Sequence, residues 1–425
     1  MNGTDFFAEK KPVLGINGLG RIGKLTLWHH VGRKYFKEIV VNQGREIGMG
    51  MEAVAQTIEK DSTYGLIHTF LYGINAQPIV KIADEKEGKL LIDGIPVTVL
   101  RKARNPKDIS WRDYGVELVA ECTGEFLDPT ASPDSEKGAI RGHHLAGAKV
   151  VINSAAFKIK NKALPMPEDA ATLIYGINHE AFNPAQHTLI SAASCTTTGL
   201  AHMMKPLLES EKTRSMLTAS MSTVHAVTNS QCVLDSVPKA GAKDLRKSRS
   251  ILDNIILTST NAAEALALAI PEVKEIGFMA DSIRIPTKTE SLIILNVTFQ
   301  SQMGQDGEIS HIDTETINDI YKQAEAKDPE RLLVYSEEQN VSADVAGINA
   351  SIVIEGQFNH TRTAFIDVNL AHIPGLSPEV LDSFPLKTLK IPVVHAKIFG
   401  WYDNEYGSYT NRMGDLTVYV HKMMK

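Results

Sequence analysis

One cysteine of this sequence lies where a thiol can become reactive. Cys195 stands in the run Ser-Cys-Thr-Thr-Thr-Gly, after an apolar run that ends near Ala192 and before a helical pattern over residues 200–208. This order predicts a thiol near a helix N-terminus, where unpaired amide groups lower the thiol pKa and favour the nucleophilic thiolate. A lone cysteine can also be inert core, but the hydroxyl-rich neighbours favour catalysis.

A nucleophilic thiol needs a base, and His225 is the candidate. It follows an alternating apolar and polar pattern that begins near Met216, so we expect it on a strand. Catalytic cysteines commonly pair with a histidine that is distant in the sequence. The alternative is a structural histidine whose hydrogen bonds are satisfied.

A glycine pattern near the N-terminus indicates a dinucleotide site. Gly18, Gly20 and Gly23 form a G-x-G-x-x-G between the apolar run 12–17 and a helical pattern that starts at Arg21. Such glycines allow a tight turn and close approach of a pyrophosphate, which backbone amides and the helix dipole then stabilise. A turn without a ligand is the alternative, and the flanking strand and helix argue against it.

The residues after the second expected strand bear on the cofactor. The run 38–42 ends on Asn42 and is followed by Gln43, Gly44 and Arg45, so the carboxylate that usually binds the adenosine ribose is missing. Two interpretations remain open. Arg45 can pair with the 2'-phosphate of NADP, or Gln43 can bind the ribose hydroxyls of NAD while Arg45 is solvated.

Length and composition limit the class of protein. With 425 residues, 43% hydrophobic and 22% charged, the chain is typical of a globular protein of two or three domains. A formal net charge of -6 gives no reason to expect nucleic acid or a membrane surface as a partner. The three scattered cysteines argue against a disulfide framework, and without a signal or membrane segment we expect a cytoplasmic protein.

The order of elements predicts an α/β protein. The strand at 38–42 follows the first strand by about one βαβ crossover, which predicts a parallel, Rossmann-type sheet. From about Met216 longer strands predict a second, α+β catalytic domain with a mixed sheet. A helix is expected over 259–269, with Asn261 or a neighbour as N-cap, and residues 128–142 are expected to form a surface loop or insertion.

At this level of detail the sequence resembles the glyceraldehyde-3-phosphate dehydrogenase family. The segment around Cys195 is similar to the active-site signature of that family, and further similar segments occur in the same order along nearly the whole chain. They are Gly-Ile-Asn-Gly-Leu-Gly-Arg-Ile-Gly (15–23), Lys-Asp-Ser-Thr-Tyr-Gly (60–65), Glu-Cys-Thr-Gly-Glu-Phe (121–126), Thr-Val-His-Ala-Val-Thr (223–228) and Trp-Tyr-Asp-Asn-Glu-Tyr-Gly (401–407).

The resemblance implies a reaction and roles for named residues. Cys195 would attack the aldehyde of glyceraldehyde 3-phosphate, and His225 would take its proton and hold the thiolate as an ion pair. Hydride transfer to NAD or NADP would leave a thioester that inorganic phosphate cleaves to an acyl phosphate. Thr228, Ser230 and Arg284 are implied for the substrate phosphate, and Ser194, Thr196, Thr260 and Asn261 for the attacking phosphate. Arg21, Ile22, Arg104, Thr123, Gly124, Ser154 and Asn404 are implied for the cofactor, in addition to Gly18, Gly20 and Gly23 of the glycine pattern and to Gln43 or Arg45 at the ribose.

The chain departs from the family pattern in several places. Ala192 and Thr198 stand where asparagines are usual, Ser408 replaces a tyrosine, and extra residues occur at about 128–142 and 355–394. The resemblance implies a dinucleotide-binding domain at 1–194 with 402–425, a catalytic domain at 195–401, no metal, and a homotetramer acting in glycolysis, or in the gluconeogenic direction with NADP. The alternatives are a dehydrogenase of another phosphorylated aldehyde, such as erythrose 4-phosphate, and a non-catalytic scaffold.

Overall fold

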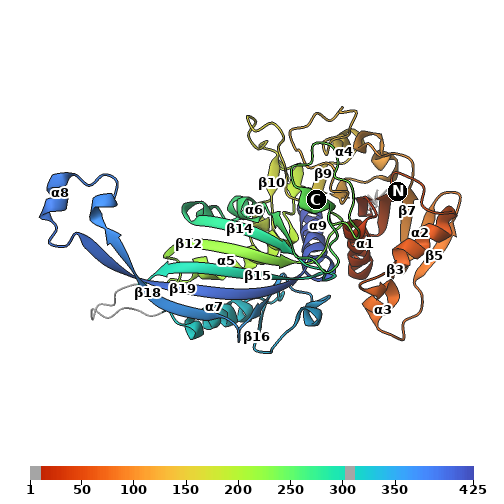
Figure 1. Ribbon diagram of the computed structural model, residues 1–425. Coiled ribbons are helices and arrows are strands. Elements are labelled where there is room, and N and C mark those ends of the chain that lie inside the picture. Colours follow the sequence, from red (N-terminus) through yellow and green to blue (C-terminus); the bar gives the residue numbers. More distant parts are fainter. Residues whose placement is uncertain (1–10, 302–311) are drawn as a thin grey trace, which may run out of the picture. The chain divides into compact units, whose positions relative to one another are not determined.

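The computed structural model describes residues 11–301 and 312–425 (Figure 1). The chain divides into two compact units, Met1–Cys195 with Glu405–Lys425, and Thr196–Asn404. The division therefore passes directly behind Cys195 and directly behind Asn404.

A nine-stranded sheet organises the first unit. Its order is β10-β11-β9-β8-β1-β2-β7-β6-β5, parallel from β10 to β7 and antiparallel at the β7-β6-β5 edge. The predicted parallel sheet is thus confirmed. The strands are β1 (Val13–Asn17), β2 (Glu38–Asn42), β5 (Val80–Asp84), β6 (Lys89–Ile92), β7 (Ile95–Leu100), β8 (Leu118–Glu121), β9 (Val150–Asn153), β10 (Ala170–Thr172) and β11 (Leu189–Ser191).

Helices and apolar side chains bury this sheet. The central strands β1, β2, β8 and β9 are almost entirely buried, as expected for parallel strands that are covered on both faces. Trp28 on α1 is fully buried and donates its indole N–H to the carbonyl of Ile58 at 2.8 Å. The remaining elements are α1 (Arg21–Arg33), α2 (Gly50–Glu59), β3 (Lys60–Asp61), β4 (Gly65–Leu66), α3 (Ile67–Tyr72), α4 (Gly142–Leu145) and α9 (Asn411–Met423).

The second unit is built on an eight-stranded mixed sheet, as predicted. The order is β13-β14-β12-β15-β19-β17-β16, and β18 pairs with β19; β12 is parallel to β14, and β16 is parallel to β17. The strands are β12 (Met216–His225), β13 (Ile256–Ser259), β14 (Gly277–Arg284), β15 (Glu290–Gln300), β16 (Leu333–Ser336), β17 (Ile352–Glu355), β18 (His360–Asn369) and β19 (Thr388–Asp403).

Helices α5 (Cys195–Glu209), α6 (Ala262–Ala269), α7 (Thr314–Ala326) and α8 (Pro378–Ser383) complete this unit. A Cβ added to Gly199 of α5 would lie 3.2 Å from Ile352 and 3.3 Å from Ile293, so the glycine permits close packing of the helix on the sheet. Tyr321 of α7 is fully buried and donates its hydroxyl to the carbonyl of Met203. Helix α5 thus packs on the sheet face to which Ile293 belongs, and α7 packs on α5.

Two expectations about local structure need correction. The helix expected from Ser259 begins at Ala262, because Ser259 still belongs to β13; Asn261 holds the N-cap position without a side-chain hydrogen bond, and the Thr260 hydroxyl accepts from the amide of Ala262. Residues 128–142 do not form a simple surface loop. Ile140 is fully buried, and Arg141 forms a two-bond ion pair with Asp169.

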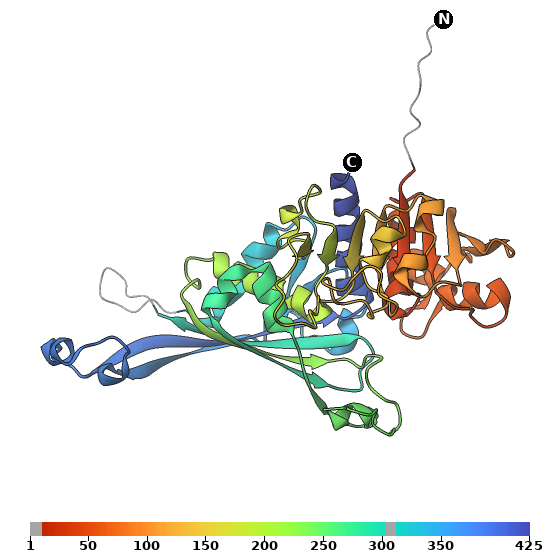
Figure 2. The same cartoon turned by 90° about the horizontal axis from the view of Figure 1, so that it is seen from above.

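The extra residues near 355–394 form a long extension of the second unit. β18 and the outer part of β19 run together as a two-stranded ribbon whose far end carries α8 (Figures 1 and 2). Among the residues described, none of the helices is both long and apolar enough to cross a membrane, and no group of three or more potential metal ligands occurs.

The turn between β1 and α1 yields a stability prediction. A Cβ on Gly23 would lie 1.9 Å from the carbonyl oxygen of Gly18, whereas one on Gly20 would meet nothing within 4 Å. Gly23→Ala is expected to lower the free energy of unfolding by about 3 kcal/mol because the backbone must shift, while Gly20→Ala should retain the wild-type value. Thermal unfolding of the two variants checks this, and equal transitions would contradict it.

Candidate active site

Three strands of the first unit end side by side next to the glycine turn. β1 ends at Asn17, β2 at Asn42 and β8 at Glu121, and the parallel register places Asn17 opposite both Asn42 and Glu121. The carboxyl ends of parallel strands are where α/β sheets bind their ligands. All three side chains are at least 98% buried, so their hydrogen bonds fix the edge of the site.

The carboxylate of Glu121 connects these elements. One oxygen accepts from the amide nitrogen of Asn17 at 2.6 Å and from Nε2 of His143 at 2.9 Å. The other accepts from the backbone amide of Thr123 at 2.7 Å and from the Thr123 hydroxyl. All four partners act as donors, which suits a carboxylate because its oxygens only accept.

The histidine partner is held in one tautomer. The indole N–H of Trp111 can only donate, and it contacts Nδ1 of His143 at 2.9 Å. The ring proton of His143 must therefore be on Nε2, where it is donated to Glu121. His143 and Trp111 are both fully buried, so this chain of hydrogen bonds extends from the core to the end of β8.

The end of β2 has acceptors that fit a ribose. Asn42 donates to Asn17 Oδ1 at 2.8 Å and to the carbonyl of Ala103 at 3.0 Å, but its own Oδ1 is buried without a partner. Oε1 of Gln43 is likewise buried without a partner. Arg45 is exposed, and the Arg104 guanidinium donates to the carbonyl of Gly44 at 3.4 Å.

The glycine turn itself fits a pyrophosphate. Gly18 has a φ of 95°, which disfavours other residues, and the space beside Gly20 is open. No side chain caps the N-terminus of α1. Its first amides, those of Arg21, Ile22 and Gly23, are in the geometry that binds phosphate oxygens.

The side chain of Arg21 is engaged elsewhere. It forms ion pairs with Asp61 and Glu405, and burial alone would lower its pKa, but the two carboxylates outweigh burial and raise the pKa above the usual value. Its side chain is thus held by Asp61 and Glu405, whereas its backbone amide is at the start of α1.

Cys195 is the first residue of α5, as predicted, and the backbone before it is unusual. Ala193 adopts a left-handed conformation with a φ of 57°, which is uncommon for a residue with a Cβ. Its carbonyl accepts from the hydroxyl of Tyr409 at 3.1 Å. Cys195 is partly accessible.

Tyr409 was missed by the sequence analysis, which treated Ser408 as the replacement for a tyrosine. Residues Tyr406–Thr410 form a π-helical turn, in which the amide of Thr410 donates to the carbonyl of Glu405 at 2.8 Å. Such a turn holds one extra residue, and Tyr409 follows Ser408. Burial raises the pKa of Tyr409 well above its usual value, and the negative charge of the nearby Cys195 thiolate adds to this effect.

The other two thiols are in different environments. Cys122 is buried beside the hydroxyl of Thr26, and burial together with the charge of Glu121 raises its pKa to about 12. Such a thiol is inert at neutral pH. Cys232 is partly exposed in the loop after β12, where its sulfur donates to the carbonyl of Lys247 at 3.3 Å.

His225 ends β12 and lies opposite Arg284, which ends the parallel neighbour β14. Nη1 of Arg284 is 2.6 Å from Nδ1 of His225, and the amide nitrogen of Asn404 is 3.3 Å from the same atom. Burial, and then the charge of Arg284, lowers the pKa of His225 to about 3. The ring is therefore neutral at neutral pH.

A serine that no motif indicated supports this group. Ser291 is buried, accepts from the amide of Ala226 at 2.9 Å and donates to Oδ1 of Asn404 at 2.6 Å. The amide group of Asn404, assigned by resemblance to the cofactor, is thus oriented by Ser291 and His225.

The residues assigned to phosphate lie in separate places. Thr228 and Ser230 have hydroxyls 3.0 Å apart, and Gln231, absent from the predicted set, bonds to both. Thr260 and Asn261 follow β13, whose Ile256 pairs with Arg284 and whose Ser259 pairs with Asp281. Antiparallel pairing places them past the middle of β14, at least three residues along the strand from Arg284.

The structure also shows the surroundings of three other predicted site residues, Thr196, Ser154 and Gly124. The hydroxyl of Thr196 contacts that of Tyr402 at 2.8 Å, which in turn contacts that of Thr223 at 2.7 Å, so it belongs to a buried network. Ser154 donates its amide to the carbonyl of Glu121 at 2.9 Å. Gly124, with a φ of 70°, follows Thr123 in the turn after β8.

The segment 401–407 contributes to both units. In the second unit, Asp403 accepts from the hydroxyl of Thr289 at 2.8 Å and from the amide of Gly347 at 2.7 Å. In the first unit, Glu405 pairs with Arg21, and the carbonyl of Tyr406 contacts Nε2 of His29 at 2.8 Å. A short motif is thus anchored separately in each unit.

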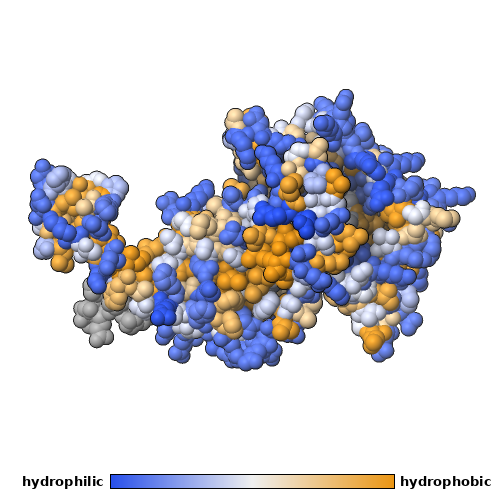
Figure 3. Space-filling model, in the orientation of Figure 1, coloured by the Kyte–Doolittle hydropathy of each residue, from blue (hydrophilic) through white to orange (hydrophobic). Residues whose placement is uncertain are grey.

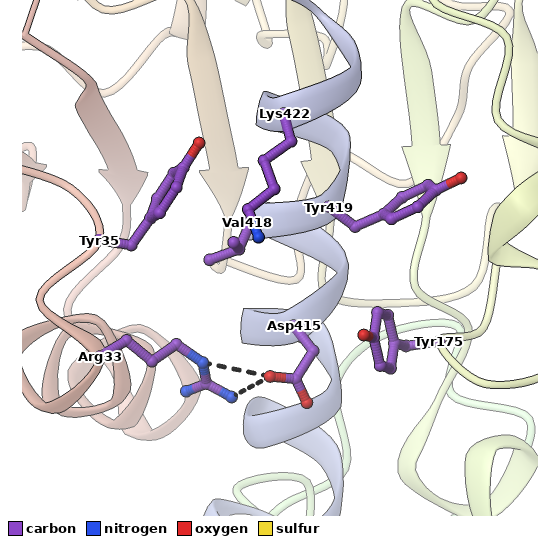
Figure 4. A pocket seen from close by; sticks show the side chains of 7 residues that line it. All are labelled: Arg33, Tyr35, Tyr175, Asp415, Val418, Tyr419 and Lys422. Atoms are coloured by element: carbon purple, nitrogen blue, oxygen red, sulfur yellow. Dashed lines mark hydrogen bonds and ion pairs between the residues drawn. The ribbon is translucent and has the colours of Figure 1, made fainter. Parts of the chain in front are cut away.

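A cavity of about 350 Å³ in the first unit lies away from these residues (Figure 4). It is located at the C-terminal end of α1, opposite the glycine turn, and Arg33 in its wall is bound to Asp415 at 2.7 Å. The lining residues are Arg33, Tyr35, Tyr175, Asp415, Val418, Tyr419 and Lys422.

A dinucleotide-binding sheet together with a second unit built on a mixed sheet is the architecture of a two-domain dehydrogenase. The family model "Glyceraldehyde 3-phosphate dehydrogenase, NAD binding domain" matches residues 13–129, and "Glyceraldehyde 3-phosphate dehydrogenase, C-terminal domain" matches residues 194–373. The chain belongs to the glyceraldehyde-3-phosphate dehydrogenase family, and its first unit contains the domain that binds NAD or NADP.

Curated relatives agree along the length of the chain. Glyceraldehyde-3-phosphate dehydrogenase of Streptomyces coelicolor is 33% identical over 96% of this chain and 98% of its own length. Glyceraldehyde-3-phosphate dehydrogenase 1 of Bacillus cereus is 31% identical with the same coverage, and the enzyme of Chlamydia pneumoniae is 33% identical over 96% and 99%.

The hydrogen bonds of Glu121 predict that the protein loses stability when this carboxylate is replaced. Glu121→Gln replaces an acceptor by an NH₂ group that faces donors, so the free energy of unfolding should fall by about 2–3 kcal/mol. Denaturant unfolding measures this. The matched control is Glu117→Gln, whose carboxylate is in an accessible ion pair with Lys149 and is worth little; equal losses would refute the role of the network.

The contact between Arg284 and His225 predicts a shift in titration. Arg284→Ala removes a positive charge, so the pKa of His225 should rise from about 3 toward the ordinary 6.5. Titration of the labelled imidazole by NMR measures it. Arg249→Ala, which removes an exposed arginine paired with Asp235, should leave the pKa of His225 unchanged; an unchanged pKa in Arg284→Ala would contradict the assignment.

Proposed function

We propose that this protein is a phosphorylating glyceraldehyde-3-phosphate dehydrogenase that acts through a thioester on Cys195. The observation that carries the proposal is the position of Cys195. It is the first residue of α5, follows the left-handed Ala193 and is partly accessible. Membership of the family and the names of the curated relatives support the substrate.

The proposed reaction uses the side chains of this chain in sequence. The sulfur of Cys195 attacks the aldehyde carbon, and the neutral imidazole of His225 accepts the thiol proton, although its lowered pKa makes it a weak base. Bound nicotinamide supplies the hydride acceptor, and loss of hydride from the hemithioacetal leaves a thioester. An oxygen of inorganic phosphate then attacks the carbonyl carbon, the carbon–sulfur bond breaks, and the thiolate of Cys195 is restored.

Two groups of residues are proposed to hold the phosphates. Arg284, with Thr228 and Ser230, would bind the phosphate of the substrate, and the guanidinium also keeps His225 neutral. Ser194, Thr196, Thr260 and Asn261 would bind the attacking phosphate; because the Thr196 hydroxyl is bound to Tyr402, its contribution would be through its backbone amide at the start of α5.

For the cofactor, the contacts at the end of β2 favour NAD over NADP. Oδ1 of Asn42 and Oε1 of Gln43 are buried acceptors without partners, and the ribose hydroxyls of NAD are donors that satisfy such atoms. A 2'-phosphate has no strong donor at neutral pH and would face these acceptors. Exposed Arg45 is the residue that would offset this effect if NADP is used.

We further propose the wider setting that the resemblance implies. The domains would be 1–194 with 402–425 and 195–401, and the protein would be a homotetramer in the cytoplasm that acts in glycolysis or gluconeogenesis. The partners would be a phosphorylated aldehyde and inorganic phosphate.

Initial rates of NAD and NADP reduction with glyceraldehyde 3-phosphate, with and without inorganic phosphate, test the proposal. We expect turnover that depends on phosphate and is faster with NAD. Cys195→Ser should lower the rate by about 10³-fold or more, because a hydroxyl is a far weaker nucleophile than a thiolate; Cys232→Ser is the matched control and should retain the wild-type rate.

Other outcomes lead to definite alternatives. Turnover that prefers erythrose 4-phosphate and does not depend on phosphate would establish a related aldehyde dehydrogenase. No turnover with either aldehyde and either cofactor would support a non-catalytic scaffold. Faster turnover with NADP would overturn the interpretation of Asn42 and Gln43 but not the reaction.

A further inference from the structure

The extension of the second unit is an isolated ribbon, which we call the arm (residues 360–392). β18 pairs with β19 from His360–Lys397 to Asn369–Thr388. Among the described residues, β15 and the following Ser301 cover the other edge of β19 only as far as Pro392. In that part of the chain, residues 366–369 and 388–391 extend beyond the rest of the sheet as two strands (Figures 1 and 2).

The arm exposes large apolar side chains. Figure 3 shows apolar residues at the tip of the arm and along the ribbon. The register places Ile366 opposite Ile391 and Val368 opposite Leu389 on one face of the ribbon. Six exposed apolar residues of the arm, each between 38% and 62% accessible, are Phe365, Ile366, Val380, Phe384, Leu386 and Leu389.

A ribbon of two strands has little stability by itself. Two strands without a third strand or a covering layer are marginally stable in water. Within the described residues, β19 is the sole strand partner of β18, so one edge of ten residues lacks a neighbouring strand. β18 itself contains no proline, and its register with β19 has no bulge although Pro392 lies opposite Phe365; a free edge without proline or bulge is a template for another strand.

The charge of the arm indicates the nature of the partner. Arg362, Lys387 and Lys390 are balanced by Asp367, Glu379 and Asp382, so three basic and three acidic residues give no net charge, whereas the whole chain has -6. Asp367 lies opposite Lys390 in the register. A strongly acidic or basic partner would find as much repulsion as attraction, but a second arm has the same alternation of signs.

The exposed apolar area of the arm is also large enough for a specific interface between two arms. At about half exposure, six large apolar side chains present on the order of 500 Å² on one arm. Two arms together bring about 1,000 Å², which is roughly the minimum for a specific interface. An isologous contact, in which the same surface of both copies is buried, is the common arrangement in homo-oligomers.

We propose that the arm is an assembly element that packs on the arm of a second copy of this chain, with the free edge of β18 at the contact. This surface is separate from the proposed catalytic residues, so its test does not depend on dehydrogenase activity.

Measurement of mass by light scattering or sedimentation tests the proposal on the full chain. Ile366→Lys and Leu389→Lys each place a charge on the same face of the ribbon and should lower the mass of the assembly about twofold at micromolar concentration. Ile74→Lys is the matched control, because Ile74 is 86% exposed in the first unit; it should retain the wild-type mass. Thermal unfolding and cofactor affinity of the first unit identify a variant that has merely failed to fold.

Hydrogen exchange provides a second, independent measurement. The amides of β18 should be protected at high protein concentration and exchange faster on dilution of the wild-type protein. A monomeric wild type would show that the arm has a different partner. An unchanged mass in both arm variants, or exchange of β18 that does not depend on concentration, would equally overturn the proposal.

Discussion

The first unit depends on the burial of one carboxylate, that of Glu121. A buried carboxylate is costly unless donors surround it, and here they come from Asn17, Thr123 and His143. These residues belong to β1, to the turn after β8 and to α4, so the cost is offset only when all three elements are in place. Because Asn17 in turn accepts from Asn42, the same interaction fixes the end of β2 and thereby the ribose side of the cofactor site.

The features that the sequence analysis predicted correctly depend on local chemistry. The glycine turn, the parallel pairing of β1 with β2, the mixed sheet of the second unit and the start of α5 at Cys195 follow from short patterns whose physical causes lie within a few residues. For His225 and Arg284, the sequence analysis predicted the two residues but not the contact between them. The resemblance named both residues, but the parallel register of β12 and β14 explains why they touch; burial, and then the charge of Arg284, lowers the pKa of His225 and keeps the imidazole neutral.

The features that were missed depend on the three-dimensional fold. Ser291 is the one polar residue on the buried face of β15, and its link between Ala226 and Asn404 exists only after β15 has paired. Asn261 has the residue type of an N-cap, yet the hydroxyl of Thr260 meets the amide of Ala262 because β13 continues to Ser259. Tyr409 could not be placed from its position in a motif, because the π-helical turn changes the face on which it lies.

The π-helical turn also affects how the chain is compared with its relatives. In Tyr406–Thr410 a hydrogen bond spans five residues instead of four, so one residue more than an α-helical turn is held between Glu405 and α9. Deletion of a single residue here would convert the turn to ordinary α-helix. The ion pair of Arg21 with Glu405, which precedes the turn, would remain, and so would the buried face of α9 with Met413, Leu416 and Val420. Single-residue insertions and deletions can therefore accumulate at this point during divergence without a change in the register of the last helix, and an alignment gap placed elsewhere in 401–412 would misassign the tyrosine that supports Ala193.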